Sequence, residues 1–252
     1  MNVKKIGPIG FHTLTITSAV EKTVELIEMK NHCYQIIIAN AYSLVLAKKT
    51  PEFHHVCQNA DIVFADGQSV VWASILLGER LPARVAGPDF MWSFCSMSAG
   101  KKYKHFLLGG RSEYLELLKN RMINSFPEIQ ITGTYSPPFG EWNDEENEKI
   151  VSLINESKAD VLWVGISTPK QDIWIDRFKN KLTVKVALGV GAAFDFHAGR
   201  IKRAPKLLQS IGLEWLYRLS QDPKRLWRRY LIGNIQFLGI LLEEIIRKVR
   251  RK

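Results

Sequence analysis

The stretch Asp160-Val-Leu-Trp-Val164, followed by Gly165-Ile-Ser-Thr-Pro-Lys-Gln171, decides the fold class of this chain. Four consecutive apolar residues of β-forming type indicate a strand that is buried on both faces. The glycine and the Ser-Thr-Pro sequence end this strand, and a proline is typical of the first turn of a helix. The stretch therefore predicts one strand-turn-helix unit of a parallel sheet.

Five more apolar runs resemble 160–164 and also end at small or turn-forming residues. They are Gln35-Ile-Ile-Ile-Ala39, Asp61-Ile-Val-Phe-Ala65, Lys104-His-Phe-Leu-Leu108, Ile129-Gln-Ile-Thr-Gly133 and Val184-Lys-Val-Ala-Leu188. Between them, apolar residues recur at i, i+3, i+4 spacing in segments that begin near a Ser, Thr or Asp, namely 18–30, 68–77, 112–125 and 144–156. This alternation predicts an α/β fold, a Rossmann-like parallel sheet covered by helices.

The distribution of charge divides the chain into two parts. The net charge of the 252 residues is +10. Residues 1–199 contain 21 Lys or Arg and 21 Asp or Glu, whereas residues 200–252 contain 14 and four. The basic part has no strand pattern and shows two helical stretches separated by Gln221-Asp222-Pro223. We therefore expect an α/β core domain over residues 1–200 and a basic amphipathic helical appendage at the C-terminus over residues 201–252.

Composition excludes several classes of protein. With 46% apolar and 24% charged residues, the chain is neither disordered nor collagen-like. The cysteines at 33, 57 and 95 have neither even pairing nor CxxC spacing, so we expect no disulfide framework and no zinc knuckle. The N-terminus lacks the apolar segment of a signal peptide, and the apolar stretch 230–242 is shorter than the roughly 20 residues that cross a bilayer. These features predict a cytosolic chain without a transmembrane span.

Arg, Trp, Tyr and Leu are interleaved at helical spacing in the C-terminal part. The pattern runs from Leu213-Glu-Trp-Leu-Tyr-Arg-Leu219 through Pro223-Lys-Arg-Leu-Trp-Arg-Arg-Tyr-Leu231. It is typical of a helix in a membrane interface, with aromatic side chains at headgroup depth and cations towards anionic lipid. Nucleic-acid binding is the competing interpretation, but residues 226–249 contain more Leu and Ile than a phosphate-tracking helix needs. We expect an anionic membrane surface as a partner and no nucleic acid.

Polar and glycine residues follow several predicted strands, at the edge of a parallel sheet where ligands bind. Gly109 and Gly110 open a helix in a layout whose N–H groups can approach a phosphate; a plain tight turn with Ser112 as the helix cap fits equally well. The turn 165–171 offers Lys170 and Gln171 to a donor molecule.

The run Gly189-Val-Gly-Ala-Ala-Phe-Asp-Phe-His197 is small and apolar, as a backbone pressed against a ligand at Gly191 requires. It then offers Asp195 and His197, although close packing with a structural, hydrogen-bonded His197 fits the same residues. Tyr135-Ser-Pro-Pro-Phe-Gly140 places an aromatic on a stiff turn, where it either stacks on a nucleobase or packs on the surface.

Asp66 ends the predicted strand 61–65, where a carboxylate lies at the mouth of the sheet. It suits a general base that deprotonates an acceptor hydroxyl, and it also suits a cap of the helix that begins at Gln68. In the loop 81–89, Arg84 can clamp a diphosphate by paired hydrogen bonds, and Asp89 fits a helix cap.

Known cofactor and metal motifs are missing from the sequence. It contains no GxGxxG, Walker, HExxH or GxSxG pattern, and Asp195-Phe-His197 is the nearest approach to the DxD of metal-dependent sugar transferases. We therefore predict no cofactor and no metal site. The charge of a leaving diphosphate must then be met by Arg, Lys and backbone N–H groups.

Six blocks taken together resemble the WecG/TagA/CpsF glycosyltransferases. They are Ala65-Asp-Gly-Gln-Ser-Val-Val71, Arg84-Val-Ala-Gly-Pro-Asp89, Phe106-Leu-Leu-Gly-Gly110, Pro169-Lys-Gln171, Gly189 to Gly199, and Arg203-Ala-Pro205 through Gly212-Leu-Glu-Trp-Leu-Tyr-Arg-Leu219. Their order and their spread over nearly the whole chain make the resemblance specific.

The resemblance implies an inverting, metal-independent glycosyltransferase that takes a UDP-sugar, often UDP-N-acetylmannosamine or its uronic acid. The implied acceptor is a sugar on polyprenyl diphosphate, as in teichoic acid, common antigen and capsule pathways. Such an enzyme works peripherally at the cytoplasmic face of the cell membrane, and the sequence is compatible with a homo-oligomer.

The resemblance also implies roles for single residues. The base of the family falls on Asp66 and its active-site glutamine on Gln171. Its C-terminal arginines fall on Arg218, Arg225 and Arg228. Asp195 falls where the family contacts uracil, and Phe139 lies near its stacking aromatic.

One position departs from the family pattern. The family often has Thr two residues before the Asn that follows the predicted strand 35–39, and here Ile38 stands two residues before Asn40. A hydroxyl contact to substrate is then lost beside Asn40, so a hexose or uronic-acid donor stays open.

Two rival functions remain open at this point. A nucleotide-binding oxidoreductase fits the strand-helix alternation, although the glycine fingerprint is missing. A non-catalytic membrane-docking protein fits the basic C-terminal part. Bound NAD would favour the first, and absence of UDP release with any acceptor would favour the second.

Overall fold

The main sheet of the computed structural model, which describes residues 2–29 and 32–250, has six strands in the order β4-β3-β8-β7-β5-β6. The strands are β3 (Tyr34–Ala39), β4 (Ile62–Ala65), β5 (Lys104–Leu108), β6 (Gln130–Tyr135), β7 (Val161–Val164) and β8 (Val186–Gly189). The pairs β3–β8, β8–β7, β7–β5 and β5–β6 are parallel. All six predicted strands are present, and the predicted α/β class is confirmed.

Contacts group the chain into two compact units. Unit 1 comprises Met1–Thr15, Ile38–Ala86 and Arg203–Lys252, and unit 2 comprises Ile16–Ile37 and Gly87–Lys202. The predicted boundary between residues 200 and 201 lies beside the point where the chain passes from unit 2 into unit 1. The segment expected to form one core, residues 1–200, contributes to both units.

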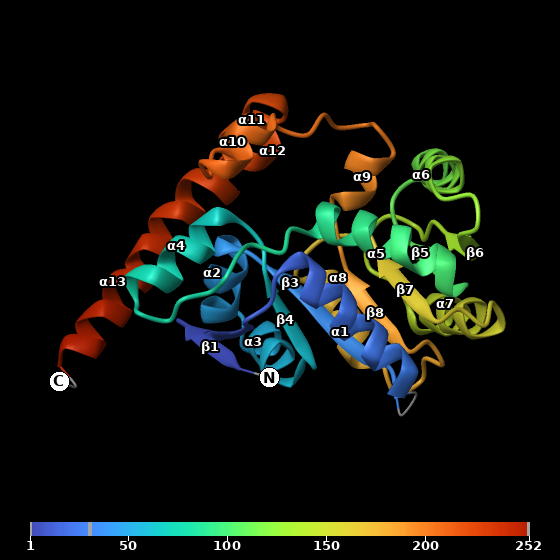
Figure 1. Cartoon of the computed structure of the whole chain (residues 1–252), viewed down its shortest axis with the longest axis horizontal. Helices are drawn as coiled ribbons and strands as arrows, with labels where there is room; N and C mark the ends of the chain where they lie inside the picture. Colours follow the sequence, from blue (N-terminus) through green and yellow to red (C-terminus); the bar gives the residue numbers. More distant parts are fainter. Residues whose placement is uncertain (1, 30–31, 251–252) are drawn as a thin grey trace. The chain divides into compact units, whose positions relative to one another are not determined.

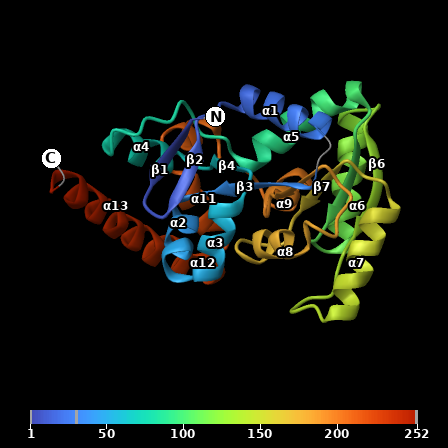
Figure 2. The ribbon, with the colours of Figure 1, turned by 90° about the horizontal axis from the view of Figure 1, so that it is seen from below.

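Unit 2 covers both faces of its strands with helices, because side chains alternate along each strand. On one face, Leu162 and Val164 pack in a core that includes side chains of α7 (Asp144–Glu156) and α8 (Lys170–Phe178). On the other face, Trp163 meets the ring of Phe94 in α5 (Gly87–Lys101). Figure 2 shows α1 (Ile16–Met29) and α5 on the side opposite α7 and α8.

Two further helices complete unit 2, α6 (Ser112–Ser125) and α9 (Ala193–His197), and they pack on each other. The predicted helices at 18–30, 112–125 and 144–156 correspond to α1, α6 and α7, so these three predictions are confirmed, apart from Lys30, which lies outside the described residues.

Unit 1 begins with an antiparallel hairpin of β1 (Val3–Ile6) and β2 (Ile9–His12). Around β4 the chain forms α2 (Ala41–Lys49), α3 (Pro51–Asn59) and α4 (Gln68–Leu76), the last of which confirms the predicted helix at 68–77. The C-terminal elements are α10 (Lys206–Ser210), α11 (Glu214–Gln221), α12 (Pro223–Trp227), the π-helix η1 (Arg228–Ile232) and α13 (Gly233–Val249). The predicted break is confirmed, because α11 ends at Gln221 and the Asp222 side chain caps α12.

The last helix is both part of the core of unit 1 and amphipathic. Phe237, Ile240 and Leu241 are buried, and α13 lies beside α2 (Figure 1). The fit is close: a Cβ at Gly7, whose φ is +55°, would stand 2.8 Å from Ile240 Cγ2. A second apolar stripe of α13 is exposed, and it consists of Ile235, Leu238, Leu242, Ile246 and Val249. The predicted basic amphipathic C-terminal helix is thus confirmed, with one face packed on its own unit.

Candidate active site

Asp66 of unit 1 lies in the turn that follows β4. Its N–H donates to the carbonyl of Ala39, 2.8 Å away, and Val85 N–H donates to Ala65 O at 2.8 Å. The next residue, Gly67, has a φ of +96° and is the N-cap of α4, which has no side-chain cap bond. Asp66 therefore does not cap this helix, and its carboxylate is available for other interactions.

Burial and charge set the proton affinity of Asp66. The pKa of its carboxyl group is raised to about 6, mainly by burial and also by the like charge of Glu214. Three guanidinium groups act in the opposite direction, those of Arg84, Arg203 and Arg229. A carboxyl group with this pKa is ionised at neutral pH and still takes up a proton readily, which is what a general base requires.

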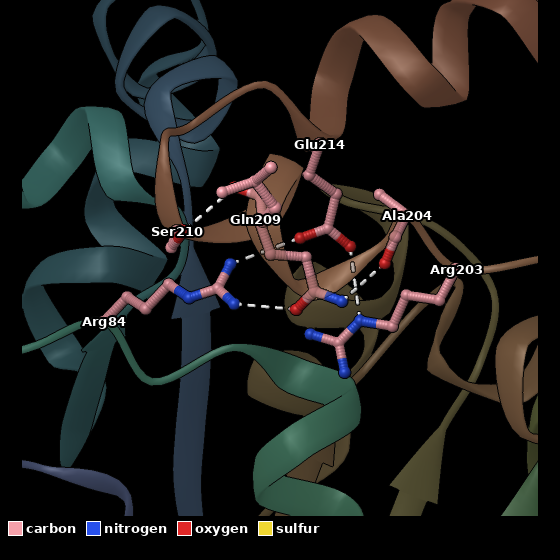
Figure 3. Close-up of polar contacts among 7 residues, drawn as sticks. Arg84, Arg203, Ala204, Gln209, Ser210 and Glu214 are labelled. Carbon is pink, nitrogen blue, oxygen red and sulfur yellow. Dashed lines mark hydrogen bonds and ion pairs between the residues drawn. The ribbon is translucent and has the colours of Figure 1, made fainter.

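Glu214 at the start of α11 joins two of these arginines (Figure 3). Its Oε2 atom lies 3.2 Å from Arg84 Nη1, and its Oε1 atom accepts from Arg203 Nε at 3.3 Å. All three side chains are half-buried. An ion pair with little access to water is screened less than a surface pair, so this triad holds its members in place.

Gln209 in α10 fixes the other end of the Arg84 guanidinium. Its Oε1 atom accepts from Arg84 Nη2 at 2.8 Å, and its Nε2 atom donates to Ala204 O at 2.7 Å. The amide is therefore oriented by the backbone and presents its oxygen to Arg84. Both Nη atoms of Arg84 are thus bound by protein acceptors, Gln209 and Glu214, and its clamp on a diphosphate stays a prediction.

Arg229 in η1 is the third arginine that acts on Asp66. Burial lowers the pKa of its guanidinium, and neighbouring Arg218 lowers it further. Its Cζ atom lies 5.1 Å from the ring centre of Tyr42 and 5.9 Å from that of Tyr230. Its buried Nε atom has no hydrogen-bond partner.

Of the three predicted C-terminal arginines, Arg225 and Arg228 lie at the surface. Arg225 pairs with Asp222, with 2.7 Å between Nε and Oδ2, and Arg228 lies 5.2 Å from the ring centre of Trp227. Arg218 is half-buried near Arg229. Asn40 caps α2, since its side-chain oxygen accepts from Tyr42 N and Ser43 N.

Gln171 of unit 2 lies in the first turn of α8, beside the end of β8. Its Nε2 atom donates to Thr168 Oγ1 at 3.3 Å, whereas its buried Oε1 atom has no partner. A Cβ at Gly189 would stand 2.6 Å from both Gln171 Nε2 and Asp172 Oδ1. Burial raises the pKa of Asp172 to about 8, so this neighbour of Gln171 is largely protonated at neutral pH.

Glycines form the turns of unit 2 at the positions predicted to approach a ligand. Gly109 and Gly110 have φ values of +113° and +75°, and Gly191 has +50°. A Cβ at Gly109 would stand 2.8 Å from Gly165 O, so only glycine fits there. The N-cap of α6 is Arg111 without a side-chain cap bond, and Ser112 is the first residue of the helix.

The remaining predicted residues of unit 2 have varied surroundings. Asp195 forms a two-point ion pair with Arg200, at 2.7 and 2.9 Å. His197 Nε2 lies 2.9 Å from Pro88 O and its ring stacks on Trp92, which matches the structural interpretation of this histidine. Phe139 is fully exposed on its turn.

Sequence reasoning assigned no role to four residues that the structure brings into the Asp66 cluster. These are Arg203, Gln209, Glu214 and Arg229. Arg203 and Glu214 stand in the last of the six blocks that carry the family resemblance, which was the available signal.

Two general features of the described residues concern metal binding and membrane spans. Within residues 2–29 and 32–250, no three or more His, Cys, Asp or Glu side chains gather as a metal ion would need. Over the same ranges, no helix is long and apolar enough to span a membrane.

Comparison with known proteins gives consistent matches. Residues 4–251 match the model of the glycosyl transferase WecG/TagA/CpsF family. A protein of Bacillus spizizenii strain W23 is 32% identical over 231 residues, which cover 92% of this chain and 88% of the relative. A protein of Staphylococcus aureus strain MRSA252 is 30% identical over 255 aligned positions, covering 100% and 95%. Both relatives are named N-acetylglucosaminyldiphosphoundecaprenol N-acetyl-beta-D-mannosaminyltransferase.

Proposed function

Since this chain belongs to the WecG/TagA/CpsF family of glycosyltransferases, we propose that it transfers N-acetylmannosamine or a related sugar from its UDP derivative to a polyprenyl-diphosphate-linked acceptor. The names of the relatives support N-acetylglucosamine as the acceptor sugar and undecaprenol as the lipid. The product is an intermediate of a cell-surface polysaccharide such as a teichoic acid or a capsule. Membership of this family favours neither an oxidoreductase nor a non-catalytic docking protein.

The raised pKa of Asp66 at the end of β4 is the observation that carries the proposed mechanism. An acceptor hydroxyl attacks the anomeric carbon of the donor, the bond from this carbon to the β-phosphate oxygen breaks, and UDP leaves with the electron pair. The hydroxyl proton passes to Asp66, whose pKa of about 6 suits a base at neutral pH. Attack opposite the leaving group inverts the configuration at the anomeric carbon.

Arginines of unit 1 meet the charge of the leaving diphosphate in this proposal. Arg229 acts electrostatically on Asp66 and has a buried nitrogen without a partner, while Arg218 lies beside it. Two guanidinium groups close together repel each other, and a diphosphate between them would relieve the repulsion. Arg225 and Arg228 are more exposed and suit contacts with the lipid-linked acceptor.

Donor contacts are proposed for the turns of unit 2. The backbone at Gly109, Gly110 and Gly191 suits phosphate or sugar oxygens, and the unpaired Gln171 oxygen suits a donor hydroxyl. We propose that Asp195 contacts the uracil ring of the donor and that Phe139 stacks near it. We also propose that Asn40 contacts the substrate through its side-chain nitrogen.

Peripheral docking at the cytoplasmic face of the cell membrane completes the proposal. The exposed stripe of α13 and the partly exposed Trp227 supply apolar contacts, and the lysines and arginines around them attract anionic lipid. Each basic residue near such a surface contributes about 1 kcal/mol. Arg225→Glu changes the charge by two and should weaken binding to phosphatidylglycerol vesicles by roughly 30-fold. Binding equal to that of the wild type would contradict the docking orientation.

The decisive experiment is a transfer assay with defined substrates. UDP-N-acetylmannosamine, its uronic acid and UDP-N-acetylglucosamine are each offered with a synthetic polyprenyl-diphosphate-N-acetylglucosamine, and UDP release and glycolipid product are measured. We expect turnover with a mannosamine-type donor and a loss of about 10²–10⁴-fold in Asp66→Asn. Glu21→Gln, which changes an exposed carboxylate of α1, is the control. No transfer from any donor, or full turnover by a folded Asp66→Asn chain, would refute the function or the base.

A further inference from the structure

Glu214 is an acidic side chain among arginines, at a place where a diphosphate-binding enzyme is expected to collect positive charge. It stands in the first turn of α11 and binds Arg84 and Arg203 through its two carboxylate oxygens, at 3.2 and 3.3 Å. A surface ion pair contributes little to stability, and a half-buried carboxylate between two arginines costs solvation. Its presence therefore calls for an explanation beyond folding.

The geometry indicates what Glu214 does to the arginines. Arg84 is held at both Nη atoms, by Glu214 and by Gln209, and Arg203 is held at Nε. These contacts tie the loop that carries Arg84 to α10 and α11, as Figure 3 shows. Without an acceptor between them, the two like-charged guanidinium groups would repel each other, and the carboxylate of Asp66, on which both act electrostatically, would attract them.

The same carboxylate acts on Asp66 through space. The charged groups that face Asp66 are Glu214 from α11, Arg84 and Arg203 from loops, and Arg229 from η1. Glu214 is the only anion in this set, and the three cations favour an ionised, weakly basic Asp66. The single negative charge of Glu214 offsets part of the positive charge of Arg84 and Arg203, and this keeps Asp66 a competent proton acceptor.

We propose that Glu214 is a positioning residue of the transfer reaction: it holds Arg84 and Arg203 away from direct pairing with Asp66, so that Asp66 remains the base and Arg229 remains the cation for the leaving diphosphate. This inference rests on the proposed function of Asp66. In this proposal Arg84 and Arg203 act through their ion pairs with Glu214, and they are not the main ligands of the phosphate groups.

The test compares Glu214→Gln with Glu214→Asp in the full-length chain. The glutamine variant removes the negative charge at nearly constant shape, and the aspartate variant keeps the charge. In Glu214→Gln, Asp66 gives up its proton at lower pH, so the acid limb of kcat/KM against pH should move down by about one pH unit. The plateau should also fall, since a weaker base is a poorer catalyst. In Glu214→Asp the acid limb should stay at the wild-type pH.

A direct titration separates the inference from the proposed function. The carboxyl carbon of Asp66 is followed by NMR in chains with ¹³C-labelled aspartate, and the resonance is assigned by its loss in Asp66→Asn. A downward shift of its titration in Glu214→Gln but not in Glu214→Asp supports the inference. An unchanged titration in a folded Glu214→Gln chain overturns it. A shifted titration with an unmoved acid limb leaves the role of Glu214 intact and refutes Asp66 as the base.

Discussion

Replacement of Asp66 by asparagine should stabilise the folded chain while it removes activity. The pKa of this carboxyl group rises from its ordinary value of 3.8 to about 6 on folding. A rise of about two pH units corresponds to about 3 kcal/mol of unfavourable free energy when the group is ionised. Because Asp66 is partly accessible to solvent, screening reduces this figure, and we expect about 1–3 kcal/mol.

The sign follows from proton linkage. The folded state binds the Asp66 proton more tightly than the unfolded state, so protonation favours folding. The favourable contribution is fully present below pH 3.8 and is lost as the pH rises through about 6. Asparagine is neutral at every pH and lacks this loss. The variant should therefore exceed the wild type in stability at pH 8, and the difference should shrink towards zero near pH 4.

Urea unfolding of both chains, followed by far-UV circular dichroism at pH 4, 6 and 8, measures the difference. Glu21→Gln, at an exposed position of α1, serves as the matched control and should show no comparable dependence on pH. Equal midpoints for Asp66→Asn and wild type at pH 8 would refute the reasoning. So would a difference that grows on acidification.

Three further outcomes follow from the structure. Transfer should continue in excess EDTA, because guanidinium groups near Asp66 supply the positive charge that a metal ion supplies in a metal-dependent enzyme. Loss of activity in EDTA that one added metal restores would contradict this prediction. Gly189→Ala should lower kcat/KM by about 10²-fold, because the new Cβ must displace Gln171 or Asp172. Gly100→Ala, whose new Cβ has no atom within 4 Å, is the control and should behave as wild type. Equal kcat/KM values for the two variants would remove Gln171 from the site. Truncation after Gly199 should abolish transfer and lower the thermal midpoint, because it deletes buried Leu226, Phe237 and Ile240; a truncated chain with an unchanged midpoint would show that these contacts add nothing.

The strands other than β6 could be predicted because they have apolar residues on both faces, as in Ile36-Ile-Ile38 and Leu162-Trp-Val164. Asp66 could be singled out as well, since it directly follows such a strand. The sequence left open whether it caps a helix, and this depended on the φ of Gly67. No local pattern reports that angle.

The partners of Asp66 could not be predicted because they are distant in sequence. Arg84 and Glu214 are 130 positions apart, and Arg84 and Gln209 are 125 apart. Arg228 and Arg229 are adjacent and chemically alike, yet one lies against Trp227 at the surface and the other is buried near Tyr42. Helical phase decides between them, and the π-helical turn at 228–232 alters this phase from that of a regular α-helix.

The π-helical turn also connects the two proposed roles of the C-terminal segment, completion of the candidate site and binding to lipid. An inserted residue rotates the helix that follows, so the side chains before and after the turn face different directions. Before it, Leu226 is buried in unit 1, and within it Arg229 reaches the Asp66 cluster. After it, α13 presents one apolar face to α2 and a second to solvent. A segment that only anchored the protein would need the exposed face alone. The buried arginine and the packed face indicate that the same segment is part of the fold and of the candidate site, so a change that loosens it should affect stability, activity and lipid binding together.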